Sequence, residues 1–149
     1  MIELESSSPE ETERIAARLA KELAVGDVIT VAGELGSGKT TFVRGAARGL
    51  GVNEPVTSPT YTIGNRYRGD VDISHLDLYR FQSLDEAEWG NVEDYFVDAI
   101  TFVEWPEVGG GFLPDPRARV RLLHRGGERR LIEVVSSEKS LENRLSSTC

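Results

Sequence analysis

The chain has 149 residues, of which 25 are acidic and 17 are basic, so its formal net charge is −8. This length fits one domain with a single hydrophobic core. The negative charge argues against tight, sequence-independent binding of RNA or DNA, because such binding needs Lys and Arg to neutralise phosphates. The only cysteine, Cys149, excludes a disulfide framework and a cluster of thiolate metal ligands.

The first residues do not contain the basic stretch followed by an apolar one that marks a secretory leader. No later segment is long and apolar enough to span a bilayer. We therefore expect a cytoplasmic protein with no membrane partner.

The first predicted element is an amphipathic helix that begins at Ser8. Glu11 follows this predicted N-cap by three residues, which is the spacing of a capping box. Apolar residues recur at helical spacing over 15–23, and Gly26 is expected to end the helix.

A phosphate-binding loop follows. Residues 28–33, VITVAG, are continuously apolar and predict a strand buried on both faces of a sheet. The segment from Gly33 to Thr40 then has the P-loop spacing G-x-x-x-x-G-K-[ST]. Residues 39–50 predict a helix that ends at Gly51. Because this motif requires a strand before it and a helix after it, we predict a nucleoside triphosphate site here.

In a P-loop, backbone N–H groups point at phosphate oxygens beside the positive end of the following helix. Lys39 would bridge the β- and γ-phosphates, and the Thr40 hydroxyl would ligate Mg²⁺. Thr41 can donate to the α-phosphate. The predicted nucleotide-binding residues of this loop are Glu34, Leu35, Gly36, Ser37, Gly38, Lys39, Thr40 and Thr41.

The second half of the chain is rich in strand patterns. Two hairpins are predicted, one from residues 60–67 and 71–79 and one from residues 118–125 and 129–135. Between them we expect a short helix over 83–89 capped by Ser83, a second short helix over 91–98, a strand over 99–105 and a loop over 109–116.

Hairpins among apolar strands mean that the sheet cannot be wholly parallel. The predicted fold is therefore an α/β, P-loop NTPase-like three-layer sandwich with a mixed, partly antiparallel central sheet. We expect residues 1–135 to form a single domain, followed by a polar C-terminal helix or tail over 136–149.

Hydrolysis by a P-loop protein needs a carboxylate near the magnesium ion, commonly at the end of a neighbouring apolar strand. Glu104 ends the run ITFVE, and Asp77 ends VDISHLD. The string TSPTYT (57–62) offers hydroxyls where GTPase-like proteins have a switch loop. Trp105 would lie near the metal and nucleotide. His75 shares a strand face with Asp77, although its pattern is more typical of an ordinary core or surface histidine.

Together these pieces resemble one family. GELGSGKTTFVRG, TSPTYTI, HLDLYR and VEWPE, in this order and spacing, are similar to the TsaE (YjeE) family. The resemblance covers about residues 12–134 and implies a small ATPase of bacterial tRNA threonylcarbamoyladenosine biosynthesis. It implies ATP and Mg²⁺ as cofactors and the TsaB–TsaD heterodimer as partner, with tRNA reached only through that complex.

By position, the resemblance implies a role for each matching residue. Lys39 and Thr40 would hold phosphate and Mg²⁺, with Glu104 as the second metal ligand. The remaining implied site residues are Asp77 in hydrolysis, Thr60 in the switch-like loop, Trp105 beside the nucleotide, Thr12 near the adenine and Arg130 near the site. Ser37 departs from the family, which more often has Ala there.

Other nucleotide-dependent functions fit parts of the sequence. A GTPase would carry N-K-x-D to recognise guanine, and NVED (91–94) lacks the Lys. A small-molecule kinase would need an acceptor pocket and a lid, for which only 109–121 is available. A nucleotide-sensing interaction module with negligible turnover is the third alternative.

Overall fold

The computed structural model describes residues 1–59, 63–79 and 81–147. In chain order, its helices and strands are β1 (Ile2–Ser6), α1 (Pro9–Ala20), β2 (Val28–Gly33), α2 (Lys39–Gly49), β3 (Gly64–Arg68), β4 (Asp72–Asp77), α3 (Glu86–Val92), β5 (Ile100–Glu104), β6 (Ala118–His124), β7 (Arg130–Val135) and α4 (Lys139–Ser147). Short 3₁₀ helices are η1 (Glu93–Phe96), η2 (Pro106–Val108) and η3 (Gly110–Phe112).

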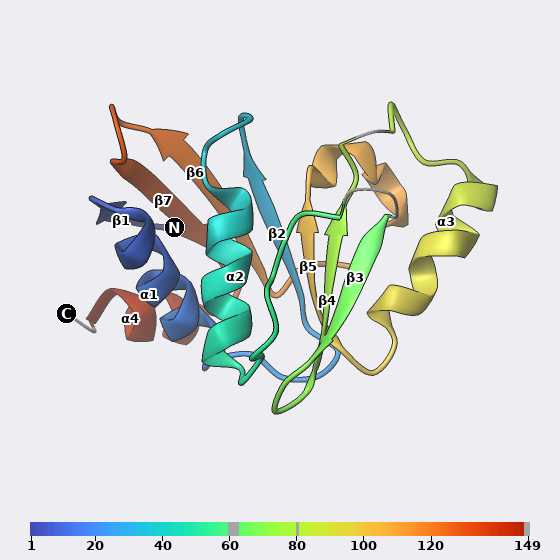
Figure 1. Cartoon of the computed structure of the whole chain (residues 1–149), viewed down its shortest axis with the longest axis horizontal. Coiled ribbons are helices and arrows are strands. Elements are labelled where there is room, and N and C mark those ends of the chain that lie inside the picture. The colour runs from blue at the N-terminus through green and yellow to red at the C-terminus, as the bar shows by residue number, and fades with distance from the viewer. Residues whose placement is uncertain (60–62, 80, 148–149) are drawn as a thin grey trace.

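The strands form one seven-stranded sheet in the order β1-β7-β6-β2-β5-β4-β3 (Figure 1). The three pairs at its centre, β6–β2, β2–β5 and β5–β4, are parallel. The outer pairs, β1–β7, β7–β6 and β4–β3, are antiparallel. The predicted mixed α/β sheet is therefore confirmed.

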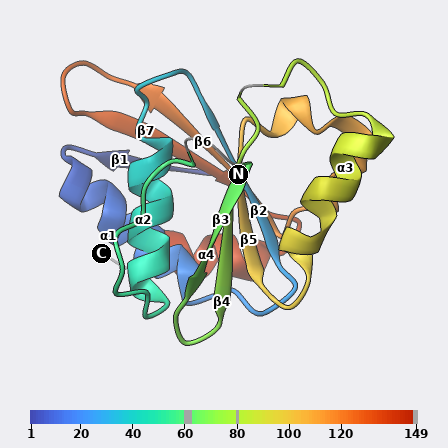
Figure 2. The same cartoon turned by 45° about the vertical axis from the view of Figure 1, so that its right-hand side comes forward.

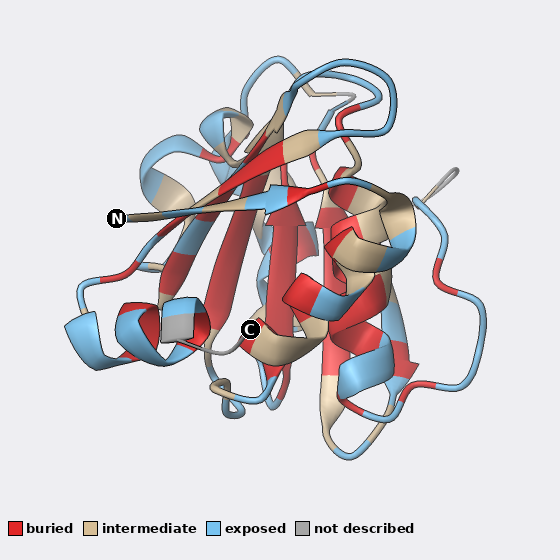
Figure 3. Cartoon of the chain, turned by 90° about the vertical axis from the view of Figure 1, so that its left-hand side faces the viewer, coloured by how far each residue is buried: buried red, intermediate tan, exposed pale blue. Residues whose placement is uncertain are grey.

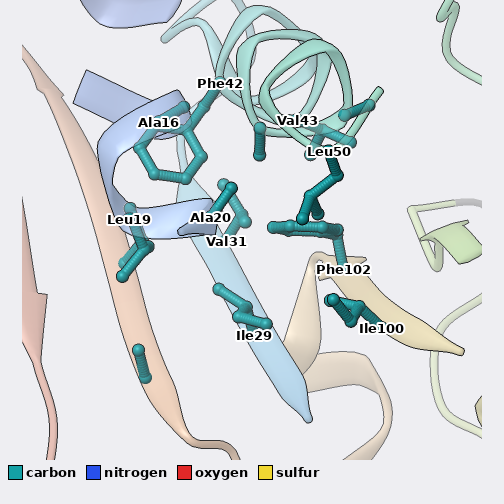
Figure 4. Close-up of a cluster of buried hydrophobic side chains, with 14 of the residues drawn as sticks. Ala16, Leu19, Ala20, Ile29, Val31, Phe42, Val43, Leu50, Ile100 and Phe102 are labelled. Atoms are coloured by element: carbon teal, nitrogen blue, oxygen red, sulfur yellow. The ribbon is translucent and has the colours of Figure 1, made fainter. Parts of the chain in front are cut away.

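Two apolar layers hold helices against the two faces of the sheet. On one face, α1 and α2 pack on β2 and β5 through side chains such as Leu19, Phe42, Ile29 and Phe102 (Figure 4). On the other face, Val28, Leu76 and Val103 pack with α3 and the 3₁₀ helices. Figure 2 shows α2 and α3 on opposite sides of β4 and β5. The result is three layers, with buried residues along the inner strands (Figure 3).

The start of α1 and the end of α2 lie where the sequence predicts them. The Ser8 hydroxyl accepts a hydrogen bond from the Glu11 N–H at 3.1 Å. Gly51 follows the C-cap of α2 with a φ of 88°, the left-handed conformation that glycine adopts readily. In contrast, α1 ends at Ala20, well before Gly26, because the Glu22 and Leu23 N–H groups bond to the Leu19 and Ala20 carbonyls in tighter turns and do not continue the α-helical pattern.

Two predictions on the second half need correction. The N-cap of α3 is Asp85, not Ser83, and Asp85 and Glu88 form a reciprocal capping box. The segment predicted as a helix over 91–98 contains the end of α3 and then η1, which is a tighter turn.

The polar C-terminal segment forms α4, and its two leucines enter the main core. Leu141 and Leu145 are buried in the cluster that also contains residues of α1. An ion pair between Arg144 and Glu22 at 2.5 Å further connects α4 to the turn that follows α1. No helix in the described part of the chain has the length and apolar character needed to cross a membrane.

If α4 is part of the domain core, truncating its buried leucine must destabilise the whole domain. We expect Leu141→Ala to lower the free energy of unfolding by about 2–5 kcal/mol, the usual cost of a Leu-to-Ala cavity. The matched control Asn143→Ala, at an exposed position of the same helix, should change it by less than about 0.5 kcal/mol. Urea unfolding of both variants measures this, and equal stabilities would mean that α4 is dispensable.

Candidate functional site

The P-loop lies at the sheet edge where β2 ends, at the top of Figure 1. Gly33, Gly36 and Gly38 have φ values of 149°, 76° and 99°, which L-amino acids with a Cβ rarely adopt. A Cβ on Gly33 would also lie 2.5 Å from the Ser37 hydroxyl and 2.7 Å from the Leu122 carbonyl oxygen. Glycine at position 33 is therefore required both by its φ and by its surroundings.

The N-terminus of α2 differs from those of α1 and α3. Its N-cap is Gly38, with no side-chain cap bond and no acidic residue in the first turn. The Ser8 and Asp85 side chains, by contrast, cap α1 and α3, and both helices begin with acidic turns. Because N–H groups at a helix start favour anions, the start of α2 fits a phosphate group.

Lys39 is the first residue of α2 and is only 5% exposed. Its Nζ donates to the carbonyls of Gly33 and Glu34 at 2.7 and 2.9 Å, and it lies 4.4 Å from the centroid of the Trp105 ring. Burial lowers the pKa of Lys39, and nearby carboxylates, that of Glu104 foremost, offset part of this lowering. An ammonium with so little water around it gains from an anionic ligand in the cleft.

Glu104, at the end of β5, is the buried acid of the site. It is 3% exposed, and its Oε2 accepts a hydrogen bond from the Thr40 hydroxyl at 3.0 Å. The same oxygen lies 2.5 Å from Nε2 of His75 on β4. A hydroxyl that gives its proton to a carboxylate keeps its lone pairs for a metal ion, so Thr40 and Glu104 fit the oxygen ligation that Mg²⁺ prefers.

Asp77 ends β4 directly beside Glu104, because the two residues are register partners in the parallel β4–β5 pair. Its Oδ2 accepts from the Ser58 hydroxyl at 2.9 Å, and its Oδ1 accepts from the Tyr79 N–H at 3.0 Å. Asp77 thus connects the strand edge to the segment that precedes β3.

These groups surround one cleft of about 640 Å³. Its lining includes the predicted residues Leu35, Gly36, Gly38, Lys39, Thr40, Thr41, Asp77, Glu104 and Trp105, together with Ser58, Pro59 and Tyr79. The described residues contain no group of three or more His, Cys, Asp or Glu side chains arranged for a metal ion. The carboxylates in the lining are those of Asp77 and Glu104, and proteins commonly hold Mg²⁺ through one or two carboxylates plus substrate phosphates.

Trp105 closes one side of the cleft from a left-handed backbone conformation, with φ 57° and ψ 52°. Its ring packs against Tyr79 at a centroid distance of 4.9 Å. Non-glycine residues in this region cost about 1–2 kcal/mol and cluster at functional sites. The indole is thus held between Tyr79 and the Lys39 ammonium.

Arg130, on β7, donates hydrogen bonds to the backbone of the P-loop. Its Nε donates to the Ser37 carbonyl at 2.9 Å, and its terminal nitrogen donates to the Gly36 carbonyl at 3.2 Å. It therefore contacts the loop backbone but does not line the P-loop cleft, and its role at the site stays a prediction. Ser37 itself is fully buried, and its hydroxyl has no hydrogen-bond partner among the described residues.

Two further predicted site residues, Thr12 and Thr60, are not among the described residues that line the P-loop cleft. Thr12 is buried on α1, where its hydroxyl bonds that of Ser6 at 2.7 Å, and it does not line the P-loop cleft. Ser6 is nevertheless the register partner of Arg130 across β1 and β7. Thr60 lies outside the described residues, so its place in a switch-like loop, like the adenine contact of Thr12, stays a prediction.

The structure gives contacts in the site to three residues for which the sequence predicts no role of their own. His75, expected as an ordinary core or surface histidine, contacts Glu104. Ser58, from the TSPTYT string, and Tyr79, from HLDLYR, contact Asp77. The alternation of His75 and Asp77 along β4 was the available signal, since residues two apart share a face of a strand. The partner of His75 depends on the register between β4 and β5, which no local pattern contains.

Comparison with known proteins gives a consistent family. The family model described as "Threonylcarbamoyl adenosine biosynthesis protein TsaE" matches residues 6–132. The Bacillus subtilis (strain 168) protein named tRNA threonylcarbamoyladenosine biosynthesis protein TsaE is 39% identical over 131 residues, which cover 87% of this chain and 82% of the relative. The Haemophilus influenzae protein of the same name is 36% identical over 134 residues, covering 89% and 83% of the two chains.

A solved structure gives the same result. The crystal structure of Bacillus subtilis YdiB superposes with a TM-score of 0.81 at 31% sequence identity. The match covers 97% of this chain and 93% of that chain. The two proteins therefore share one fold over nearly the full length of both chains.

The two glycines with different surroundings give a test of the loop geometry. We expect Gly33→Ala to lower the free energy of unfolding by about 2–5 kcal/mol, since a strained φ costs about 1–2 kcal/mol and overpacking about 1–3 kcal/mol. At Gly36 a Cβ would meet no atom within 4 Å, so Gly36→Ala should cost only the strain of its positive φ, about 1–2 kcal/mol. Denaturant unfolding ranks them, and a Gly36 variant at least as unstable as the Gly33 variant would contradict this geometry.

Proposed function

The chain belongs to the TsaE family, and from this membership and the geometry of its cleft we propose that it binds and hydrolyses Mg²⁺-ATP in support of tRNA threonylcarbamoyladenosine biosynthesis. We further propose that it acts with the TsaB–TsaD heterodimer and meets tRNA only through that complex. The net charge of −8 supports an indirect contact with tRNA, because an acidic chain is poorly suited to bind RNA phosphates and its partners would hold the RNA.

One observation carries the proposal. Lys39, Thr40, Asp77 and Glu104 come from three separate elements and line a single cleft at the start of α2. A glycine-rich strand-to-helix turn with only a structural role would not need two carboxylates, a buried ammonium and an uncapped helix start at the same point.

Each part of the cleft has a distinct task in this proposal. The loop N–H groups and Lys39 bind the β- and γ-phosphates and offset their charge as it shifts in the transition state. Thr40 and Glu104 would hold Mg²⁺, which neutralises phosphate charge when bound. Asp77 orients the attacking water and accepts its proton, while Trp105 and Tyr79 limit access of bulk water from one side.

Two other functions remain for the same cleft. A small-molecule kinase would transfer the γ-phosphate to an acceptor and release a phosphorylated product. A nucleotide-sensing module would bind ATP with negligible turnover. Both predict ATP binding, so only the fate of the γ-phosphate separates them from an ATPase.

The deciding experiment measures phosphate release from Mg²⁺-ATP by the purified chain, alone and with TsaB–TsaD. We expect a low basal rate that rises when the heterodimer is present. Lys39→Ala should abolish nucleotide binding or turnover while circular dichroism stays native, because its charge-assisted contacts would be made to phosphate. Full turnover in this variant would show that the loop is not the active one. Absence of phosphate release in both conditions would favour the sensing module.

Neutralising the two carboxylates should impair different properties of the protein, nucleotide binding in one variant and hydrolysis in the other. Glu104→Gln removes a negative charge beside the proposed metal site, so we expect weaker Mg²⁺-dependent binding and slower turnover together. Asp77→Asn should leave ATP affinity largely unchanged and slow hydrolysis by about a hundredfold or more, the usual scale for losing a positioned acid–base or water-orienting group.

Nucleotide titrations and single-turnover rates on both variants separate these effects. Asp77 is matched to Glu104 by strand register and differs from it in burial, so each variant serves as the control for the other. Wild-type hydrolysis by Asp77→Asn in the presence of TsaB–TsaD would reduce that residue to a structural role.

A further inference from the structure

His75 is an imidazole enclosed in an otherwise apolar layer. Its side chain is fully buried, and it lies on the face of β4 that packs toward α2, as does Ile73 two residues earlier. Across the β4–β5 pair, its register partner is the buried Phe102. An apolar side chain of similar size would fill this place without removing two polar nitrogens from water.

Among the described residues, the polar partner of the ring is Glu104. Nε2 lies 2.5 Å from Glu104 Oε2, whereas Nδ1 is buried and has no hydrogen-bond partner among the described residues. Since a carboxylate oxygen can only accept, the ring carries a proton on Nε2 and donates it to Glu104. The histidine therefore adds one directed N–H at the end of β5.

That N–H fixes one oxygen of the carboxylate. Oε2 receives two donors, His75 Nε2 and Thr40 Oγ1. Oε1 accepts no hydrogen bond from the part of the chain that the structure describes, and Glu104 lines the P-loop cleft. The two donors on Oε2 restrict the orientation of the carboxylate and leave Oε1 as its oxygen without a donor among the described residues.

We propose that His75 is a positioning residue: it holds the Glu104 carboxylate in the orientation that lets Thr40 and Glu104 ligate a divalent cation together. This inference rests on the Mg²⁺-dependent nucleotide binding proposed above. Groups that orient metal ligands commonly change metal affinity by about 10–100-fold when they are removed. His75 contacts neither phosphate nor metal in this role, and it acts only through Glu104.

The test compares His75→Leu, which removes the donor, with His75→Gln, whose amide nitrogen can take the position of Nε2. Binding of a fluorescent ATP analogue is followed as Mg²⁺ is titrated, and again in EDTA. We expect the Leu variant to need about 10–100-fold more Mg²⁺ for half-maximal binding, with unchanged affinity in EDTA. The Gln variant should stay within about threefold of wild type. Phe102→Leu, which loses core packing beside His75 without touching Glu104, should keep the wild-type Mg²⁺ dependence.

A Leu variant with wild-type Mg²⁺ dependence would overturn the inference, as would a Gln variant no better than Leu or an equal loss of affinity in EDTA. If wild type itself shows no Mg²⁺-dependent binding, the proposed function fails, and this inference fails with it. Should the Leu variant not fold, His75→Asn replaces it. The shorter Asn amide takes the place of Nδ1 and cannot reach Oε2. The His75→Gln variant must therefore have a higher apparent Mg²⁺ affinity than the His75→Asn variant. Equal affinities of the two variants would overturn the inference.

Discussion

A carboxylate buried at the end of β5 constrains the elements around it. Removing the charge of Glu104 from water is costly unless donors surround it, and these come from α2 through Thr40 and from β4 through His75. Helix α2 and strands β4 and β5 must therefore meet at the same edge of the sheet, and little shift between them is possible. The P-loop occupies the same edge because β2 is the parallel neighbour of β5.

The charges at this edge are balanced only in part. Asp77 and Glu104 end adjacent parallel strands, so two acidic groups lie side by side. The Lys39 ammonium is the nearby cation, yet it is bonded to loop carbonyls and stacked on Trp105 and forms no ion pair with either acid among the described residues. A site with two acids, one buried ammonium and an uncapped helix start suits a ligand that carries both phosphate and a divalent cation.

The sequence supports the P-loop and the strand-end acids, because glycine spacing and apolar runs are local signals. At residues 2–6 the signal is short: Ile2 and Leu4 alternate with two glutamates, a strand pattern over only five positions, and β1 is completed by its pairing with β7. The apolar packing of α4 comes from Leu141 and Leu145, two leucines in an otherwise polar segment. The contact between His75 and Glu104 depends on pairing between strands separated by α3 and η1, so it could not be read from either strand alone.

The pairing of β1 with β7 also affects how the protein is made. Strand β1 (Ile2–Ser6) is synthesised long before its partner β7 (Arg130–Val135), so this contact has a very large sequence separation and forms late. Until then β1 is an unpaired strand, which could join with the strands of other nascent chains. Its exposed Glu3 and Glu5 put like charges along that edge and oppose such association. The same delay applies to the P-loop, whose carbonyls receive their Arg130 donors only after β7 has emerged.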